Sequence, residues 1–386
     1  MKQARTVIST YSADAFGVCS ALYELGGMIV MHDASGCNST YSTHDEPRWY
    51  GSRSLIFISA LTEMEAILGD DEKVIGDMVD TIAQLHPKFA AIVGTPIPMM
   101  TGCDLRAIAA EVEARSGIPC FAFQTNGMRS YLCGASEALE AVAARMTDRT
   151  AVRRKNAVNI LGATPLDFSL SGTVPSIAAI LRGAGFDVVS NWAMGSSLED
   201  LGRAGEAAVN LVISGTGMKA ARLLQQRFGT PYVVGTPTGT ALTARILESL
   251  RQTAADGQSR LAFADCAPSA DCENYILGEP VTARSLAAAL HLECGEDFRV
   301  ISTLEDLSEL SGVLGTQDLC LSEEEELQSA LSAARLVVAD PMYQPIAPKG
   351  CGFLALPHEA FSGRTYRRRI PDLTKLNLSA FRKAGC

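Results

Sequence analysis

One segment near the N-terminus combines several side chains that could do chemistry. Residues 31–49, MHDASGCNSTYSTHDEPRW, contain two histidines, three carboxylates, an arginine and Cys37, and they follow the apolar run GGMIVM. Such a run indicates a buried strand, so Cys37 lies in a glycine-preceded turn where its sulfur can face an interface. Soft thiolate donors hold iron in iron–sulfur clusters. We therefore interpret Cys37 as a cluster ligand, and the alternative is a buried structural thiol.

A cluster needs more than one thiolate, and two further cysteines are candidate metal ligands. Cys19 lies one helical segment before Cys37, in AFGVCSALYEL, and Cys103 lies further along the chain. Two ligands from each chain of a two-fold dimer would complete a four-thiolate site on the axis. Cys19 has two competing interpretations, as part of the apolar face of its helix or of the wall of a cavity.

The residues just after the Cys37 turn are suited to proton transfer. His44 and Asp45 stand next to each other, and Arg48 follows. A histidine beside carboxylates can deliver protons, and an arginine can anchor an anionic group. We predict that His44 and Asp45 are catalytic and that Arg48 binds substrate or cofactor. The alternative is a solvated loop with a local ion pair.

Composition excludes several classes of function. The 386 residues are 47% hydrophobic and 20% charged, which is typical of a globular protein of two or three domains. A net charge of −10 argues against nucleic acid as a main partner. No apolar run has the length of a membrane span, and no signal-peptide pattern opens the chain. Eleven cysteines without a CxxC pair then predict free thiols or metal ligands in the cytoplasm.

Nucleotide-binding motifs are absent from the sequence. The small loops GTPIP and GTPTG lack the lysine and the serine or threonine of a P-loop, and no G-x-G-x-x-G follows a predicted strand. We therefore expect neither ATP nor NAD(P) to bind this chain. If the protein does redox chemistry, its electrons come from another protein.

Short strand-like runs alternate with helical patterns along the whole chain, which predicts an α/β fold with parallel sheets. The predicted strands end in small residues or glycine, so their loops fall at the carboxyl edge of a sheet, where ligands bind. Six segments show this pattern: 89–96, 157–165, 207–217, 231–237, 274–280 and 334–341. The pattern repeats in three blocks, and we predict Rossmann-like domains at residues 1–154, 155–258 and 259–386 around a central cleft.

Four segments of the sequence occur in an order that resembles a known family. They are MIVMHDASGC, LTEMEAILGDDEKVIGDMVDTI, AAIVGTPIPMMTGCDL, and the segment from VNILGATPLDFSLSG to the strand VNLVIS. The first is similar to the histidine-to-glycine-cysteine turn of the nitrogenase component 1 family, with Asp33 where glycine is usual, and the last resembles the opening of the second domain of that family. The family includes nitrogenase alpha and beta chains, cofactor-assembly relatives, protochlorophyllide reductases and the nickel-sirohydrochlorin reductive cyclase.

The resemblance implies the catalytic component of an ATP-dependent, nitrogenase-like reductase. A separate ATP-hydrolysing iron–sulfur protein would donate electrons, and a [4Fe-4S] or larger cluster at a dimer interface would relay them to a substrate or metallocofactor in the cleft. The dimer partner would be a second copy or a homologous chain. The alternatives are a scaffold that carries a metal cluster or tetrapyrrole during assembly, and a non-catalytic partner chain of a heterodimer.

The departures from the family pattern limit what the resemblance implies. Cys37 matches the middle of three cluster cysteines, whereas the first falls at Tyr11 or Ser12 and the third at Pro96. The cysteine that holds the large cofactor falls at Ser214, so we do not expect dinitrogen reduction. The histidine ligand of that cofactor falls at His358, to which we assign a catalytic role. Cys133 matches a position that lines the same cavity in the family, and Ser214 ends a strand at the carboxyl edge of its sheet, so we assign both to substrate or cofactor binding. The alternative for Cys133 is the core of its helix.

Overall fold

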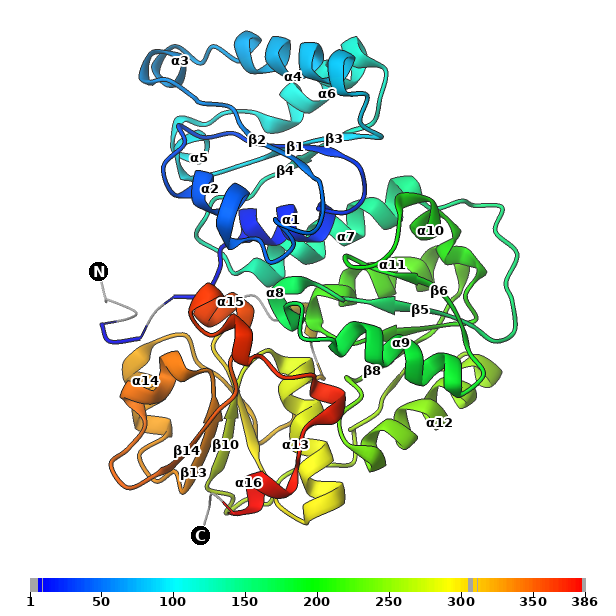
Figure 1. The fold of residues 1–386 in the computed structure, drawn as a ribbon, viewed down its shortest axis with the longest axis vertical. Coiled ribbons are helices and arrows are strands. Elements are labelled where there is room, and N and C mark those ends of the chain that lie inside the picture. Colours follow the sequence, from blue (N-terminus) through cyan, green and yellow to red (C-terminus); the bar gives the residue numbers. More distant parts are fainter. Residues whose placement is uncertain (1–5, 9, 305–307, 311, 384–386) are drawn as a thin grey trace.

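The structure is a computed structural model that describes residues 6–8, 10–304, 308–310 and 312–383. Three parallel sheets, each flanked by helices, confirm the predicted α/β fold (Figure 1). In all six segments that the sequence marks as strands, the structure has a strand. The apolar runs form strands because each is buried between helices on both faces of its sheet.

The first domain has a four-stranded sheet of order β2-β1-β3-β4. Its strands are β1 (Met28–Met31), β2 (Leu55–Ile58), β3 (Ala90–Val93) and β4 (Cys120–Phe123). Its helices are α1 (Asp14–Leu22), α2 (Cys37–Thr40), α3 (Glu63–Leu68), α4 (Glu72–Leu85), α5 (Pro96–Thr101), α6 (Leu105–Ser116) and α7 (Tyr131–Met146), and a π-helical turn, η1 (Tyr41–Asp45), follows α2.

The second domain has a five-stranded sheet of order β6-β5-β7-β8-β9. Its strands are β5 (Ala157–Leu161), β6 (Asp187–Asn191), β7 (Val209–Val212), β8 (Tyr232–Val234) and β9 (Arg260–Leu261). Its helices are α8 (Pro165–Phe168), α9 (Thr173–Gly183), α10 (Leu198–Gly202), α11 (Met218–Phe228) and α12 (Thr240–Asp256). This sheet extends to Leu261, just past the predicted boundary at residue 258.

The third domain has a five-stranded sheet of order β12-β11-β10-β13-β14. Its strands are β10 (Asn274–Leu277), β11 (Arg299–Ser302), β12 (Leu319–Cys320), β13 (Leu336–Ala339) and β14 (Gly352–Ala355). Its helices are α13 (Pro280–Cys294), α14 (Glu324–Ala330), α15 (Glu359–Ser362) and α16 (Ser379–Lys383). Among the described residues, no helix combines the length and the apolar character that a membrane crossing requires.

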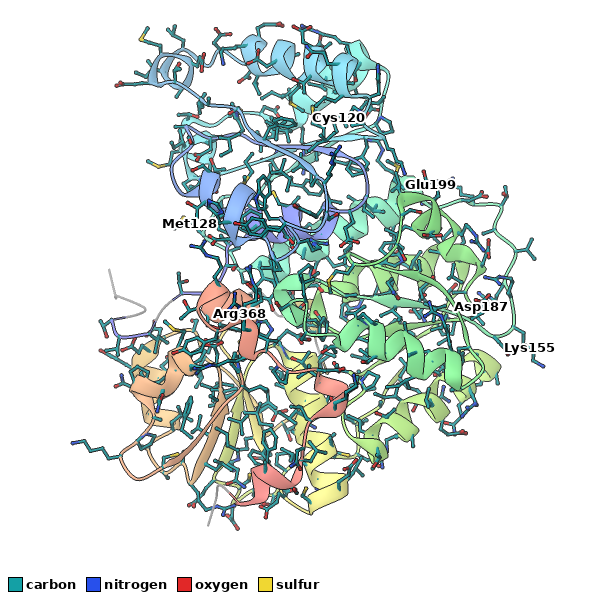
Figure 2. The ribbon with its side chains drawn as sticks, viewed as in Figure 1. Cys120, Met128, Lys155, Asp187, Glu199 and Arg368 are labelled. Atoms are coloured by element: carbon teal, nitrogen blue, oxygen red, sulfur yellow. The ribbon has the colours of Figure 1, made fainter. Side chains whose placement is uncertain are left out.

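The three domains meet where α7, α8 and α15 lie, near the centre of the molecule (Figure 1). Helix α7 packs on α1 in the first domain and on α11 in the second. Gly17 and Gly134 permit the close approach of α1 and α7, because a Cβ at Gly134 would lie 1.9 Å from the carbonyl oxygen of Asp14. Lys155 and Asp187, at the amino ends of β5 and β6, lie at the outer edge of the second domain (Figure 2).

The C-terminal segment returns across the junction between the second and third domains. The backbone N–H of Leu373 donates to Thr173 Oγ1 at 3.0 Å, and the Ser176 hydroxyl donates to Asp372 Oδ2 at 2.6 Å. Helix α16 then packs on α13. The sequence of this segment has no strong helix or strand pattern, because its conformation depends on contacts with two domains.

The sequence also predicts one helix from Leu61 to Leu85 and a strand at TVIST (residues 6–10), and the structure differs from both. The predicted helix is two helices, because Gly69 adopts φ 65° and ends α3 before α4 begins. The segment TVIST is not a strand over its described residues. The backbone N–H groups of Thr6, Val7 and Ile8 instead donate to Glu324 Oε2 at 2.9–3.0 Å.

The acidic run 323–326 is typical, in the sequence, of the solvated start of a helix, and the contacts of Glu324 correct this interpretation. Glu324 begins α14, but it is only 3% exposed. Burial alone would raise its pKa, yet the N–H donors from the N-terminal segment outweigh burial and lower the pKa of Glu324 to about 2. This carboxylate therefore joins the N-terminal segment to the third domain.

Glu324→Gln is expected to lower the free energy of unfolding by about 2 kcal/mol at neutral pH, because charge-assisted hydrogen bonds are lost. The pKa of Glu324 is about 2 in the folded chain against its ordinary 4.5. Its stabilising contribution is therefore complete above pH 4.5 and is lost as the pH falls toward 2. Urea unfolding at neutral and at acidic pH should show that the free energies of unfolding of wild type and variant become equal as the pH falls. The exposed neighbour Glu325→Gln is the control, and an equal effect of both variants would contradict the prediction.

Candidate functional site

Polar side chains from the second and third domains converge where the carboxyl ends of their strands face each other. The loop after β5 carries Asp167, the loop after β7 carries Ser214, and those after β10, β13 and β14 carry Glu279, Asp340 and His358. Parallel strands place these loops at one edge of each sheet, as the sequence predicts. The structure therefore brings Ser214 and His358, predicted separately, into one buried site.

Asp167 is the centre of this site. It is 3% exposed, and its carboxylate accepts hydrogen bonds from the hydroxyls of Tyr131 (2.6 Å), Thr164 (2.6 Å) and Ser214 (2.5 Å). The Thr164 hydroxyl also accepts from the Asp167 backbone N–H, so the turn that begins α8 orients this side chain. Burial and the nearby Asp167 raise the pKa of Tyr131 well above 10, so its hydroxyl remains a donor.

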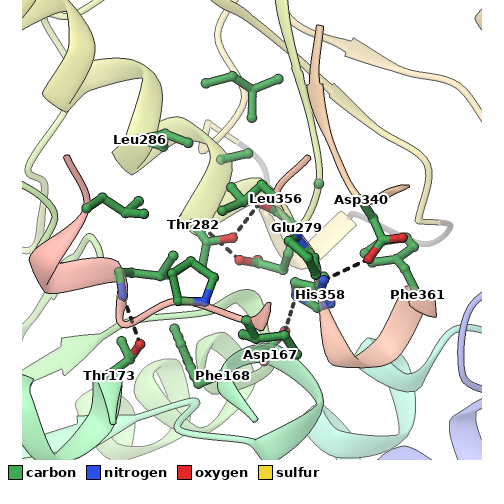
Figure 3. A pocket seen from close by; sticks show the side chains of 18 of the residues that line it. Asp167, Phe168, Thr173, Glu279, Thr282, Leu286, Asp340, Leu356, His358 and Phe361 are labelled. Atoms are coloured by element: carbon green, nitrogen blue, oxygen red, sulfur yellow. Dashed lines mark hydrogen bonds and ion pairs between the residues drawn. The ribbon is translucent and has the colours of Figure 1, made fainter. Parts of the chain in front are cut away.

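His358 faces Asp167 across the domain boundary. Its Nε2 lies 3.7 Å from Asp167 Oδ1, and its backbone N–H donates to Asp340 Oδ2 at 2.8 Å (Figure 3). The ring packs edge-on against Phe361, with the ring centroids 4.9 Å apart. Neither ring nitrogen has a hydrogen-bond partner among the described residues. Burial lowers the pKa of His358, although Asp167 and Asp340 oppose this, so the imidazole is neutral at pH 7.

Glu279 connects the two domains beneath the site. Its side chain accepts hydrogen bonds from the backbone N–H groups of Gly215 (2.9 Å), Val281 (3.1 Å) and Thr282 (2.9 Å), and so it also caps α13. Burial and the charge of Asp167 raise its pKa to about 7. This carboxyl group can therefore change its protonation state near neutral pH.

Two cavities adjoin the site, and Phe361 lines both. The inner cavity, of about 40 Å³, is bordered by Asp167, Glu279 and His358 and is otherwise mainly apolar (Figure 3). It has room for one or a few water molecules, so a larger ligand requires the domains to move apart. The outer cavity, of about 370 Å³, lies between the first domain and α15.

The residues after the Cys37 turn lie away from this site. His44 is exposed, with its Nδ1 3.4 Å from the Tyr50 hydroxyl. Asp45 lines the outer cavity and forms an ion pair with Arg364 at 3.0 Å. Neither residue lines the inner cavity, and the ion pair of Asp45 joins it to the C-terminal part of the chain.

Arg48 has an internal position. It is 4% exposed, and its guanidinium donates to Glu46 (2.7 Å), Glu24 (2.9 Å) and the carbonyl oxygens of Ser20 (2.7 Å) and Ala193 (2.8 Å). Since Ala193 belongs to the second domain, Arg48 joins the first two domains. Its donors are directed at protein acceptors, so this geometry favours a structural role over the anchoring of a substrate.

The predicted cysteines lie in different surroundings. Cys19 is fully buried in α1, and burial together with Glu46 raises its pKa. Cys133 is buried in α7 with its sulfur 3.8 Å from the Ser130 hydroxyl. Cys103 is half-buried, and its sulfur lies 3.7 Å from Asp71 Oδ1. Cys37 begins α2, and its side chain lies outside the described part of the structure.

These described cysteines do not assemble an iron–sulfur site on this chain. Such a cluster takes about four ligands, mostly thiolates. Among the described residues, the group of metal-binding side chains whose donor atoms lie within 4.8 Å of one another contains a single cysteine, Cys103.

Sequence reasoning missed Asp167, Tyr131 and Glu279. Asp167 and Glu279 each follow a predicted strand directly, in GATPLD and ILGEP, and this position is the available signal. Tyr131 carries no such signal, because it belongs to α7 of the first domain and reaches Asp167 only through tertiary packing.

Comparison with known proteins agrees with this architecture. The family model for nitrogenase component 1 type oxidoreductases matches residues 14–270. The nitrogenase iron-molybdenum cofactor biosynthesis protein NifE of Clostridium pasteurianum is 28% identical over 46% of this chain. A component of the light-independent protochlorophyllide reductase of Nostoc punctiforme is 27% identical over 48% of this chain. Each match spans 38% of the relative, so the chain covers well under two thirds of either protein.

The fold comparison extends over the whole chain. A solved structure titled "Nitrogenase Cp1 at pH 6.5" superposes with a TM-score of 0.72, covering 100% of this chain and 94% of that one at 14% identity. At this identity the likeness concerns the fold alone. The family match, which spans two thirds of the sequence, carries the assignment. The chain belongs to the nitrogenase component 1 type oxidoreductase family.

Proposed function

We propose that this chain is the catalytic component of a nitrogenase-like reductase, with reduction taking place at the junction of the second and third domains. The observation that carries the proposal is the buried pair of His358 and Asp167 beside the inner cavity. The neutral imidazole can take up a proton on its unpartnered ring nitrogen, and Asp167 can orient the ring and stabilise the imidazolium that forms. This imidazolium can then give its proton to a bound substrate. That carboxylate is kept in place by the hydroxyls that donate to it, which are those of Tyr131, Thr164, Ser214 and Thr216.

The electrons in this proposal come from a separate ATP-hydrolysing iron–sulfur protein, since the sequence has no nucleotide-binding motif of its own. An iron–sulfur cluster at the Cys37 turn would accept them. The other ligands would come from a dimer partner, either a homologous chain or a second copy of this one.

An exposed apolar surface beside the Cys37 turn supports a partner chain at this face. Helix α3 has no buried residue, and α5 packs on it. Helix α2 is joined to α5 through Asp33. The Asp33 carboxylate accepts hydrogen bonds from Thr95, which directly precedes α5, and from Asn38 in α2 at 2.7 Å. Helices α2, α3 and α5 therefore form one continuous surface. Met128 lies next to them at the edge of the first domain (Figure 2). The exposed side chains are Met64, Ile67, Leu68, Met99, Met100 and Met128. A methionine-rich apolar surface of this kind is typical of protein interfaces.

Anaerobic co-expression with a homologous component 1-like chain from the same genome tests the proposal. We expect a heterodimer with about four irons and four acid-labile sulfides, an EPR signal after dithionite reduction, and ATP-dependent hydrogen evolution with the iron–sulfur donor. Cys37→Ala in this chain should remove or alter the cluster signal, whereas the domain 3 variant Cys351→Ala should not. An iron-free, well-folded complex would contradict the proposal.

The alternative of a cofactor-assembly scaffold is favoured by the likeness to the NifE protein. A scaffold would bind the same partner and carry metal, but it would show no sustained donor-dependent turnover. Steady hydrogen evolution over many cycles therefore favours the reductase, and cluster transfer to an acceptor protein without turnover favours the scaffold.

A further inference from the structure

A second group of chemically active side chains lies at the carboxyl edge of the first sheet. His32 follows β1, Asp71 precedes α4, and Cys103 lies between α5 and α6. One donor atom from each residue lies within 4.8 Å of the other two. His32 is 4% exposed, and Asp71 and Cys103 are half-buried. The group belongs to a different domain from the site at His358.

The hydrogen bonds of His32 prepare one ring nitrogen for a metal. The Ser59 hydroxyl lies 2.9 Å from His32 Nδ1 and 3.2 Å from the carbonyl oxygen of Asp33. When this hydroxyl donates to the carbonyl oxygen, it accepts the ring proton from Nδ1, and Nε2 then keeps its lone pair for a metal. Metal-binding histidines usually donate their second ring nitrogen in this way. Burial lowers the pKa of His32, although Asp71 and Asp33 oppose this, so the ring stays neutral.

The distance between Cys103 and Asp71 fits a shared metal ion. Cys103 Sγ lies 3.7 Å from Asp71 Oδ1. Sulfur and oxygen ligands at ordinary zinc distances and a tetrahedral angle lie about 3.5 Å apart. Burial and the charge of Asp71 raise the pKa of Cys103 to about 12, so the thiol stays protonated without a cation. A bound cation would replace that proton.

The local charge also favours a cation. Asp33, Asp71 and Glu65 act on His32, and Lys73 is the opposing positive charge. Lys73 is itself paired with Glu65 at 3.6 Å and with Asp77 at 3.3 Å. The carboxylates thus outnumber the cation around the group.

We propose that His32, Asp71 and Cys103 bind one divalent ion of the zinc type, with a water molecule as the fourth ligand. Mixed nitrogen, oxygen and sulfur ligands in tetrahedral geometry are typical of zinc, and three protein ligands leave one position open. The ion would connect β1, α4 and the loop after α5. It would also support the Cys37 turn, because Asp33, next to His32, accepts from Asn38 at 2.7 Å.

Cobalt(II) titration of the metal-free full chain tests this site. We expect one Co²⁺ per chain, a thiolate-to-cobalt charge-transfer band, displacement by Zn²⁺, and release of about one proton per ion. Cys103→Ser should remove the band, and His32→Gln and Asp71→Asn should weaken binding more than 10-fold. Ser59→Ala, which removes the partner of His32 Nδ1 together with the hydrogen bonds to the backbone of Asp33, should weaken it about 10- to 100-fold.

Two controls make the outcome decisive. Cys351→Ser, in the third domain, and Cys37→Ser should both keep the band and the affinity. A band that survives in Cys103→Ser, or that disappears in Cys37→Ser, would overturn the proposal, and so would a chain that binds no Co²⁺. If Cys103→Ser does not fold, as judged by circular dichroism, folded Asp71→Asn decides, and unchanged affinity there also overturns the proposal. The site does not depend on the reductase proposal, because the readout needs neither donor nor substrate.

Discussion

His358→Gln is expected to lower donor-dependent turnover about 100- to 10,000-fold, which is the range of general acid catalysis. Glutamine keeps a similar size and polarity but cannot transfer a proton. The expected loss is in the rate constant at saturating substrate, whereas the affinity for the partner chain should not change. Hydrogen evolution with the iron–sulfur donor, measured across pH, gives this comparison. The matched control is His291→Gln, because His291 is exposed on α13 and pairs with Asp297.

The same variant has a signature in stability that needs no partner. Burial lowers the pKa of His358 below its ordinary 6.5, so below pH 6.5 the unfolded chain binds a proton that the folded chain does not. The free energy of unfolding therefore falls as the pH falls below 6.5. His358→Gln should make this fall shallower, as measured by urea unfolding at several pH values. Full turnover in His358→Gln, or an unchanged pH dependence of stability, would contradict the role assigned to His358.

Arg48→Met is expected to lower the free energy of unfolding by about 3–5 kcal/mol, because it leaves the buried carboxylate of Glu46 without its cation. Glu46 is 1% exposed and receives a 2.7 Å hydrogen bond from Arg48. The variant also removes the bond from Arg48 to the carbonyl oxygen of Ala193, so the first two domains should separate more easily. Trp49 and Trp192, the two tryptophans of the chain, flank this contact and report on it by fluorescence.

Two further variants test the cause of this loss. Arg48→Met combined with Glu46→Gln should recover part of the stability, because no unpaired charge then stays buried. Arg115→Met removes an arginine whose two ion pairs, with Glu72 and Glu111, are exposed, and it should cost less than about 1 kcal/mol. Equal losses for Arg48→Met and Arg115→Met would show that burial of the ion pair is not what matters.

The sequence by itself determined the strands and the edge of each sheet that carries the site. Runs such as AAIV and LVVA are apolar throughout, and each ends in a small residue, glycine or aspartate. A strand buried on both faces imposes this local pattern, so it can be read without the fold. The same reasoning placed Ser214 at the end of a strand, and the family match singled out His358. Their match to family positions gave them roles, and their proximity followed once the two sheets were known to face each other.

Only the tertiary structure decided which partners these side chains have. Tyr131 and Ser214 meet at Asp167, and Glu324 binds the backbone of residues 6–8, far away in sequence. Arg48 stands in a charged loop in the sequence, yet domain packing buries it against Ala193. Hydrogen bonds between distant segments depend on how the domains pack, and no local pattern of residues records that packing. For this reason the sequence predicted where a site could lie, and the fold determined which charges and hydroxyls complete it.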